Sequence, residues 1–228
     1  KKSIGNLKEV RMASSRRDPP SSRHGTASST ASDILDAAER LVQTRGFNGF
    51  SYADVSSELG ITKAALHYHF AGKAELGESL ISRYNERFDA ALAAIDATEM
   101  SAPDRLLAYC DLYRGTLRGQ RMCLCGMLAA EYNTLGEPMR DALGRFFDHN
   151  RDWLAELLET GRKAGTLRFA GPVDQAAQTI VAALEGAMLV ARPYHDTTVL
   201  DVVIDRMLAD FALGRSPVPT SLGPGPSH

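Results

Sequence analysis

Apolar residues recur at spacings of three and four along almost the whole chain, and this period most restricts its fold. Ile34, Ala38, Leu41 and Val42 stand at positions i, i+4, i+7 and i+8 and would form one buried stripe on an α-helix. No alternation of apolar and polar residues persists, so the sequence predicts no β-strand. We therefore expect an all-α protein with about nine helices.

Capping residues and helix breakers give the bounds of these helices. Ser51 and Asp54 form a capping-box pattern before the second helix. Gly60 supplies a tight turn with a positive φ after it, and Thr62 caps the third helix. The expected helices span residues 32–46, 51–59, 62–70, 73–97, 101–119, 122–135, 137–163, 172–191 and 197–213.

The two ends of the chain differ in composition from its middle. Residues 1–30 are rich in Ser, Pro, Gly and Arg, and we expect a disordered basic arm there. Residues 215–228 are rich in Pro, Gly and Ser and predict a disordered tail. Between them we expect two helical domains, residues 31–76 and 77–214.

Composition and missing motifs exclude several classes of protein. The net charge of −2 excludes a uniformly basic coat, so nucleic-acid contacts would need a local arrangement of charge. No apolar run reaches the length of a membrane span, no signal-peptide pattern opens the chain, and only three cysteines occur. These features predict a cytoplasmic protein without a membrane partner. No nucleophile–base pairing, P-loop or GxGxxG pattern supports an enzyme, and we expect no cofactor and no metal.

Residues 51–73 form the most informative segment. Two short helices joined by a glycine turn are typical of a helix-turn-helix unit, which binds DNA. Leu66 and Phe70 share the side of the third helix that would face the core. Another side gathers Lys63, Ala64, His67 and Tyr68. A helix this short can present such side chains to base edges in the major groove. The amino end of the third helix, Tyr52 and Lys73 are suited to phosphates.

The run ITKAALHYHFAGKAEL closely resembles the recognition helix and following helix of TetR-family transcriptional repressors. AAERLVQTRGFNGFSYADVSSELG resembles their first two helices, and the resemblance covers residues 32–80. One departure is His67, where the family usually has Tyr. The resemblance implies an amino-terminal three-helix domain that contains the helix-turn-helix unit. A helical ligand-binding and dimerisation domain would follow it. It implies base contacts from Lys63, Ala64 and His67, and phosphate contacts from Tyr52, Thr62, Tyr68, His69 and Lys73.

The eighth and ninth helices carry stripes that suggest a homodimer interface. Small residues on the eighth helix would allow close helix approach, and pairing with a second copy would form a four-helix bundle. Packing of both stripes within one chain is the alternative. A dimer would match a near-palindromic double-stranded operator. The predicted interface residues are Ala176, Ile180, Ala183, Ala187, Val190, Leu200, Val203, Met207 and Phe211.

The central helices are rich in aromatic and sulfur-containing residues, which favours a small-molecule pocket. Glu131 and Asn150 are its polar candidates, and a mostly apolar, weakly cationic effector would fit aromatic walls and one carboxylate. For any single residue, a place in the core is the alternative. The predicted ligand-binding residues are Tyr84, Phe88, Tyr109, Tyr113, Met127, Glu131, Phe147, Asn150 and Trp153.

Three cysteines leave a second mode of regulation open. Cys123 and Cys125 stand near Arg121 at the start of the sixth helix, where a thiol of lowered pKa would sense oxidants or electrophiles. Buried cysteine acting as a small apolar residue is the alternative for these two and for Cys110. The sequence thus predicts a repressor released by a small effector, with oxidation of Cys123 or Cys125 as the second possibility.

Overall fold

The structure is a computed structural model that describes residues 27–211. Within that range it contains nine α-helices, two short 3₁₀-helices and no strand, which confirms the all-α prediction. The predicted tail and nearly all of the predicted basic arm lie outside the described residues. The helices are α1 (Ala27–Arg45), α2 (Tyr52–Leu59), α3 (Lys63–His69), α4 (Lys73–Asp96), α5 (Ala102–Arg118), α6 (Leu124–Ala130), η1 (Tyr132–Thr134), α7 (Glu137–Lys163), α8 (Val173–Ala191), η2 (Arg192–Tyr194) and α9 (Thr198–Phe211).

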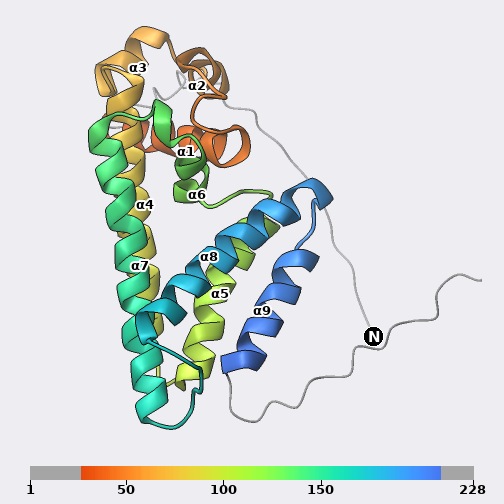
Figure 1. Ribbon diagram of the computed structural model, residues 1–228. Helices are drawn as coiled ribbons and strands as arrows, with labels where there is room; N and C mark the ends of the chain where they lie inside the picture. Colours follow the sequence, from red (N-terminus) through yellow and green to blue (C-terminus); the bar gives the residue numbers. More distant parts are fainter. Residues whose placement is uncertain (1–26, 212–228) are drawn as a thin grey trace, which may run out of the picture.

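Helices α1, α2 and α3 form a small unit at one end of the molecule (Figure 1). Ser51 and Asp54 make the predicted capping box, and Gly60 follows α2 at φ 65° in the left-handed region. The Thr62 side chain caps α3 by accepting from the Ala65 N–H at 3.1 Å. Leu66, a residue of α3, is completely buried on the side of the helix that faces the core. Local caps and one apolar anchor therefore fix the geometry of this unit.

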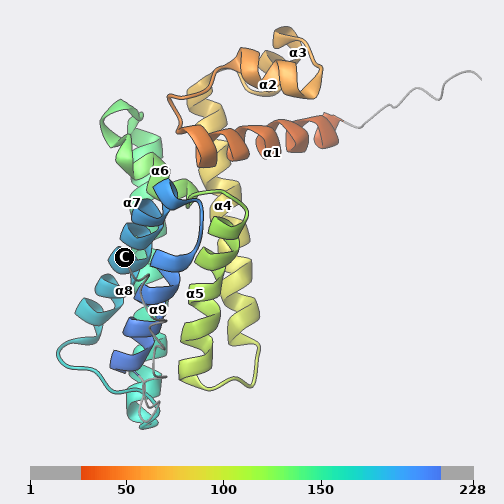
Figure 2. The same cartoon turned by 90° about the vertical axis from the view of Figure 1, so that its right-hand side faces the viewer.

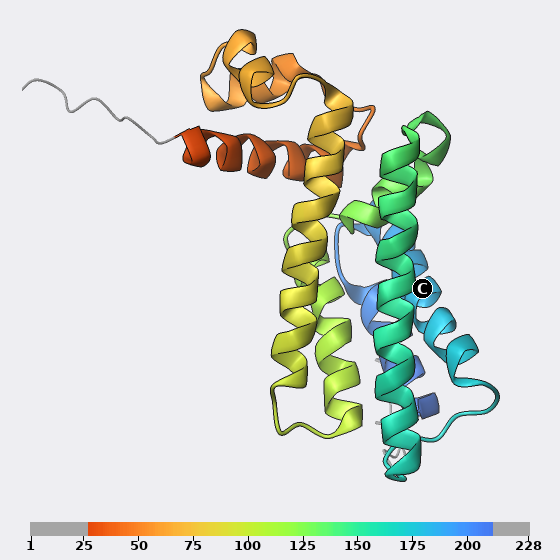
Figure 3. The same ribbon diagram turned by 90° about the vertical axis from the view of Figure 1, so that its left-hand side faces the viewer.

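Helix α4 is continuous from the three-helix unit into the rest of the molecule. It runs alongside α7, and the two are the longest helices of the described chain (Figure 3). The predicted domain boundary at residue 76 falls inside α4. The buried Glu39 of α1 accepts from Arg83 at 2.8 Å and Arg87 at 2.9 Å on α4. Helix α1 is thereby held across the upper part of α4.

The interior of the larger half is an aromatic cluster between α4, α5 and α7. Trp153 stacks on Tyr109 with ring centroids 5.4 Å apart. Asn150 has no exposed surface: its Oδ1 accepts from the Tyr109 hydroxyl at 3.0 Å, and its Nδ2 donates to the Phe146 carbonyl at 2.9 Å. A buried amide with both ends paired fixes one arrangement of the surrounding rings.

Two helix boundaries differ from the prediction. Helix α1 begins at Ala27, ahead of the expected start at Ser32. Helix α6 ends at Ala130, whereas the sequence predicted one helix over residues 122–135. At Glu131 the chain leaves the α-helix for the 3₁₀-helix η1, and the Glu131 carboxylate reaches the loop between α1 and α2. A contact between distant segments therefore shortens the helix.

Most of the predicted dimer stripe is already covered within one protomer. Ile180 and Leu200 have no exposed surface in the single chain, because α8 packs between α7 and α9. Their predicted role is therefore wrong, since a covered side chain cannot contact a second copy. The other buried members of the stripe are Ala176, Ala187, Met207 and Phe211. Ala183 and Val203 are partly exposed, and Val190 is exposed.

Candidate functional site

One edge of α3 carries polar side chains that face away from the molecule. Lys63, Ala64, His67 and Tyr68 are all exposed, and Tyr68 keeps 82% of its surface. In Figure 2, α3 lies at the outer end of the three-helix unit, away from α5, α8 and α9. The edge opposite the buried Leu66 is therefore open to a large partner.

The orientation of His67 limits what its ring can offer a partner. Its Nδ1 lies 3.1 Å from the Ala71 carbonyl oxygen, which can only accept. A proton on Nδ1 satisfies this contact and leaves Nε2 as an acceptor in the neutral ring.

Two predicted phosphate ligands have their polar groups engaged within the protein. The Tyr52 hydroxyl donates to the Phe70 carbonyl at 3.1 Å, and burial, together with the Glu75 charge, raises the pKa of Tyr52 to about 12. The Lys73 Nζ donates to the Phe50 carbonyl at 2.6 Å and lies 4.3 Å from the centre of the Phe50 ring. Burial lowers the pKa of Lys73. Both side chains brace the unit: the Tyr52 hydroxyl uses its one O–H donor within the protein, whereas the Lys73 ammonium keeps two further N–H donors.

Of the other three predicted phosphate ligands, Tyr68 is exposed at the edge described above. Thr62 is also exposed and uses its hydroxyl oxygen as the cap of α3. His69 is partly buried, and its ring lies edge-on to Tyr68 with centroids 5.3 Å apart.

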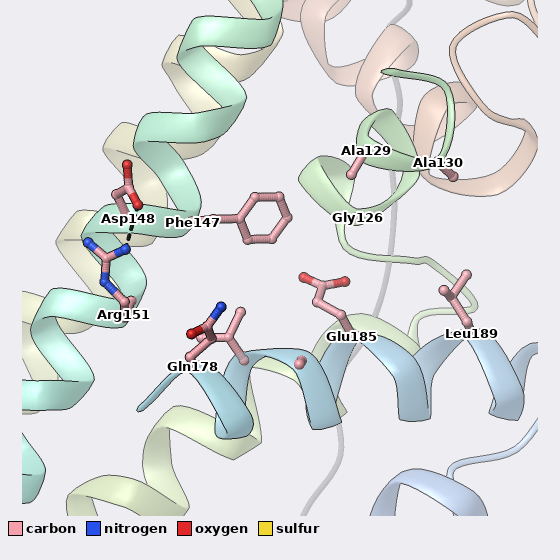
Figure 4. Close-up of a pocket in the computed structure, with 11 residues that line it drawn as sticks. Gly126, Ala129, Ala130, Phe147, Asp148, Arg151, Gln178, Glu185 and Leu189 are labelled. Carbon is pink, nitrogen blue, oxygen red and sulfur yellow. Dashed lines mark hydrogen bonds and ion pairs between the residues drawn. The ribbon is translucent and has the colours of Figure 1, made fainter. Parts of the chain in front are cut away.

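A second feature is an apolar cavity of about 450 Å³ in the larger half. Its walls come from α6, α7 and α8, and Phe147 and Glu185 point into it (Figure 4). Burial raises the pKa of Glu185 to about 7, and the neighbouring Cys123 thiol offsets part of this shift. The cavity lining comprises Gly126, Ala129, Ala130, Phe147, Asp148, Arg151, Gln178, Val181, Ala182, Glu185 and Leu189.

Comparisons with known proteins match both halves of the chain. Residues 34–80 match the family described as "Bacterial regulatory proteins, tetR family", and residues 102–207 match "Tetracyclin repressor-like, C-terminal domain". The crystal structure of a TetR-family transcriptional regulator from Agrobacterium tumefaciens is 32% identical, covers 82% of this chain and all of its own (100%), and has a TM-score of 0.79. The chain belongs to the TetR family.

Another TetR-family relative is the HTH-type transcriptional repressor NemR of Escherichia coli strain K12. It is 29% identical over 174 residues, which are 73% of this chain and 86% of NemR. The crystal structure of E. coli NemR in its reduced form is 26% identical, has a TM-score of 0.72, and covers 81% of this chain and 97% of its own. Helices α1–α3 are thus the helix-turn-helix domain of a TetR-family transcriptional regulator.

Only one of the predicted ligand-binding residues, Phe147, lines the cavity of this TetR-family chain. Tyr84, Phe88, Tyr109, Tyr113, Met127, Asn150 and Trp153 pack in the interior or at its edge instead. The hydroxyls of Tyr109 and Tyr113 lie 3.2 Å apart, and the Trp153 Nε1 donates to Asp96 at 2.8 Å. Their polar groups are thus paired within the protein, which corrects their predicted role as a pocket lining.

Glu131 also has a different role from the predicted one. Its carboxylate accepts from the backbone N–H of Phe47 at 2.6 Å and of Asn48 at 3.2 Å, both in the loop between α1 and α2. The Asn48 side chain donates to Thr134 at 2.7 Å. Charged acceptors make strong bonds to backbone N–H groups. We call this set of contacts the Glu131 latch; it joins the end of α6 to the helix-turn-helix domain.

The three cysteines are free and buried. Cys123 caps α6: its Sγ accepts from the Gly126 N–H at 3.4 Å and from the Tyr84 hydroxyl at 3.7 Å. Burial raises the pKa of Cys123 and Cys125 well above the ordinary value, and that of Cys110 to about 12. Reactive thiols instead have a lowered pKa and access to solvent. This environment is typical of structural cysteine.

The described part of the chain lacks two kinds of feature. Among residues 27–211 no cluster of three or more His, Cys, Asp or Glu side chains could hold a metal ion. In the same range no helix combines the length and apolarity needed to cross a membrane.

Sequence reasoning missed Glu185 as a site residue. It is one turn from Val181 and Leu189 on α8, in a run of apolar residues. A single charge inside an apolar run of a helix is the signal that would have found it, because an unpaired buried charge is costly and therefore informative.

Proposed function

We propose that this chain is a repressor that binds a near-palindromic operator as a homodimer and is released by a small, largely apolar effector in the cavity beside α6. The observation that carries the proposal is the exposed edge of α3 formed by Lys63, Ala64, His67 and Tyr68. TetR-family regulators bind operator DNA as dimers and respond to small molecules. Lys63, Ala64 and His67 would contact bases, and Thr62, Tyr68 and His69 would contact phosphates.

The dimer interface would use the outer faces of α8 and α9. Val190 and Val202 are exposed apolar side chains there, with 56% and 63% of their surface accessible. Ala183 and Val203 are partly exposed on the same two helices. Apolar side chains left open on neighbouring helices are typical of a subunit interface. This surface replaces the mostly buried stripe that the sequence suggested.

Helix α6 would carry the signal from the cavity to the DNA-binding domain. Gly126, Ala129 and Ala130 of this short helix line the cavity, and Glu131 at its end holds the loop between α1 and α2. Arg192, just after α8, donates to the Thr44 carbonyl at 2.6 Å at the end of α1. An effector that shifts α6 would therefore reorient α1–α3 and change the spacing of the two α3 helices in the dimer. Effector binding accounts for regulation better than thiol oxidation does, because Cys123 and Cys125 are buried with a raised pKa.

The experiment is a titration of the protein with a duplex selected from random sequence by the wild type. Lys63→Ala combined with His67→Ala should lower operator affinity by about 1–3 kcal/mol for each base that no longer has its side-chain partner. Both residues are exposed, so the free energy of unfolding should change little. Lys163→Ala, at the exposed end of α7, removes the same charge elsewhere and serves as the control.

Unchanged operator affinity in the double variant would show that α3 does not bind the bases. An equal decrease in affinity in Lys163→Ala would show that binding depends on overall charge alone.

A further inference from the structure

Glu185 is a half-buried residue whose carboxylate the protein does not fully pair. Its Oε1 is buried and has no hydrogen-bond partner. Its other oxygen passes close to α6 at Gly126, where an added Cβ would lie 2.2 Å from Oε2. The absence of a side chain at Gly126 therefore makes space for the Glu185 carboxylate. Figure 4 shows the Glu185 carboxylate reaching from α8 toward α6, into the space that Phe147 also faces.

No cation of the described chain neutralises Glu185. The groups whose pKa the Glu185 charge raises are thiols and phenols: Cys123 and Cys125 at the start of α6, Tyr84 on α4, and Tyr109 and Tyr113 on α5. Burial raises the pKa of all five, so they stay uncharged at neutral pH. On α7, Arg151 is held by Asp148 and Asp152, each at 2.8 Å. A buried carboxylate without a counter-ion costs free energy that a positively charged ligand would recover.

The rest of the cavity is suited to an apolar body. Ala129, Val181 and Leu189 offer aliphatic walls, and Phe147 offers an aromatic ring. A ring face beside a cation adds a favourable electrostatic contact when water is excluded. The volume of about 450 Å³ lies within the range of small-molecule sites.

We propose that the effector is a hydrophobic monocation, an alkyl or arylalkyl ammonium, whose charged group pairs with Glu185 while its apolar body fills the cavity between α6, α7 and α8. The role of this ligand as an effector rests on the proposed function, whereas its binding rests on the cavity itself. Glu185 thereby provides the pocket carboxylate that the sequence had predicted at Glu131.

The charge on Glu185 should make the affinity for an ammonium ligand depend on pH. Burial raises its pKa to about 7, so the carboxylate is half protonated near neutrality. An ammonium ligand stabilises the charged form, and its affinity should fall as the pH drops from about 8 to about 6. Of the groups facing Glu185, the thiols and phenols stay neutral over this interval because burial raises the pKa of each, and Arg151 stays charged because its carboxylate neighbours raise its pKa.

The experiment measures binding of three matched probes to the full-length protein by calorimetry in the absence of DNA. The probes are 4-phenylbutylammonium, 4-phenylbutanol and 4-phenylbutyrate, which share one body and differ in charge. The wild type should prefer the ammonium over the alcohol on the order of tenfold or more, and should bind the butyrate most weakly. Glu185→Gln should reduce this preference to about one, because the amide keeps the shape and removes the charge. Glu156→Gln, which changes an exposed carboxylate of α7 outside the cavity lining, should retain it.

Equal affinity for ammonium and alcohol in the wild type, or no saturable binding of the ammonium at millimolar concentration, would overturn the proposal. So would a preference that survives Glu185→Gln or that disappears in Glu156→Gln. The proposed function is tested separately, by operator affinity with and without bound probe. An ammonium that binds through Glu185 without weakening DNA binding would refute the effector role and leave the site intact. A neutral compound that releases DNA while the ammonium shows no preference would refute the site and leave the repressor intact.

Discussion

The DNA-binding end and the cavity end of this chain differ in the sequence distance over which their contacts are made. At the DNA-binding end, Ser51 caps α2 with Asp54, and Thr62 caps α3 through the Ala65 N–H. At the cavity end, Gly126, Phe147 and Glu185 come from three different helices. Short-range patterns of caps, turns and apolar spacing therefore describe the first region, whereas only the packed fold brings the second together.

The two regions also differ in how their functional side chains relate to solvent. Lys63 and Tyr68 are exposed on a helix whose opposite side is anchored by Leu66, so they can contact a large partner without any change in packing. Glu185 is half-buried in the cavity wall and lacks a counter-ion among the described residues, so it is placed to respond to something small enough to enter the cavity. One region is thus built to dock on a surface and the other to enclose a molecule.

The largest effect should come from Leu66→Ala, which removes the buried anchor of α3. Deleting a fully buried leucine side chain costs about 2–5 kcal/mol, and the helix-turn-helix domain should lose its fold before the larger half does. Urea unfolding followed by circular dichroism measures the decrease in stability. Tyr68→Ala, two positions along and exposed, is the matched control and should change stability by less than about 0.5 kcal/mol. Similar decreases in both variants would contradict the division of α3 into a core side and a DNA side.

The next effect concerns stability as a function of pH. The folded pKa of Glu185, about 7, lies above the ordinary value of 4.5, so the folded state holds more protons between these two values. Its contribution to stability is therefore fully present below about pH 4.5 and is lost as the pH rises through about 7, a change of about 3 kcal/mol. The unfolding free energy of Glu185→Gln minus that of the wild type should rise by this order from about pH 4.5 to about pH 8. A difference that stays flat across this interval would show that Glu185 is an ordinary solvated carboxylate.

A smaller effect should follow from opening the Glu131 latch. Glu131→Ala leaves the Phe47 and Asn48 N–H groups without their carboxylate, at a cost of about 1–2 kcal/mol in a partly exposed site. The ratio of operator affinities without and with an effector should move toward one, because α6 no longer holds the loop. Fluorescence anisotropy with labelled operator measures both affinities. Glu137→Ala, an exposed carboxylate in the first turn of α7, is the control. A ratio that is unchanged in Glu131→Ala would show that the signal takes another route.

Much of the helix-turn-helix end could be predicted from the sequence, because caps and turns are local. The capping box at Ser51, the left-handed Gly60 and the cap at Thr62 are each present as predicted. The sequence did not predict the bonds that Tyr52 and Lys73 donate to the carbonyls of Phe70 and Phe50, because only the tertiary fold brings these groups within reach.

The cavity end could not be predicted from the sequence. The helical period shows which face of a helix a residue lies on, but it does not show which residue packs against that face. The stripe through Ile180 and Leu200 was recognised as one packed surface, but the period cannot say whether its partner is the same chain or a second copy. Glu131 was predicted as a polar group of the pocket, yet α6 ends just before it and its carboxylate bonds the α1–α2 loop instead. Aromatic residues such as Tyr109 were assigned to a pocket because composition does not distinguish a filled core from a lined cavity.

The most direct test of the account is amide hydrogen exchange of the full-length protein, free and bound to its selected duplex. The account predicts that DNA slows exchange at the start of α3, over residues 62–68, and leaves the middle of α7 unchanged. Protection confined to α7, α8 or α9, with the amides of α3 exchanging as fast as in the free protein, would contradict the claim that the exposed edge of α3 binds DNA.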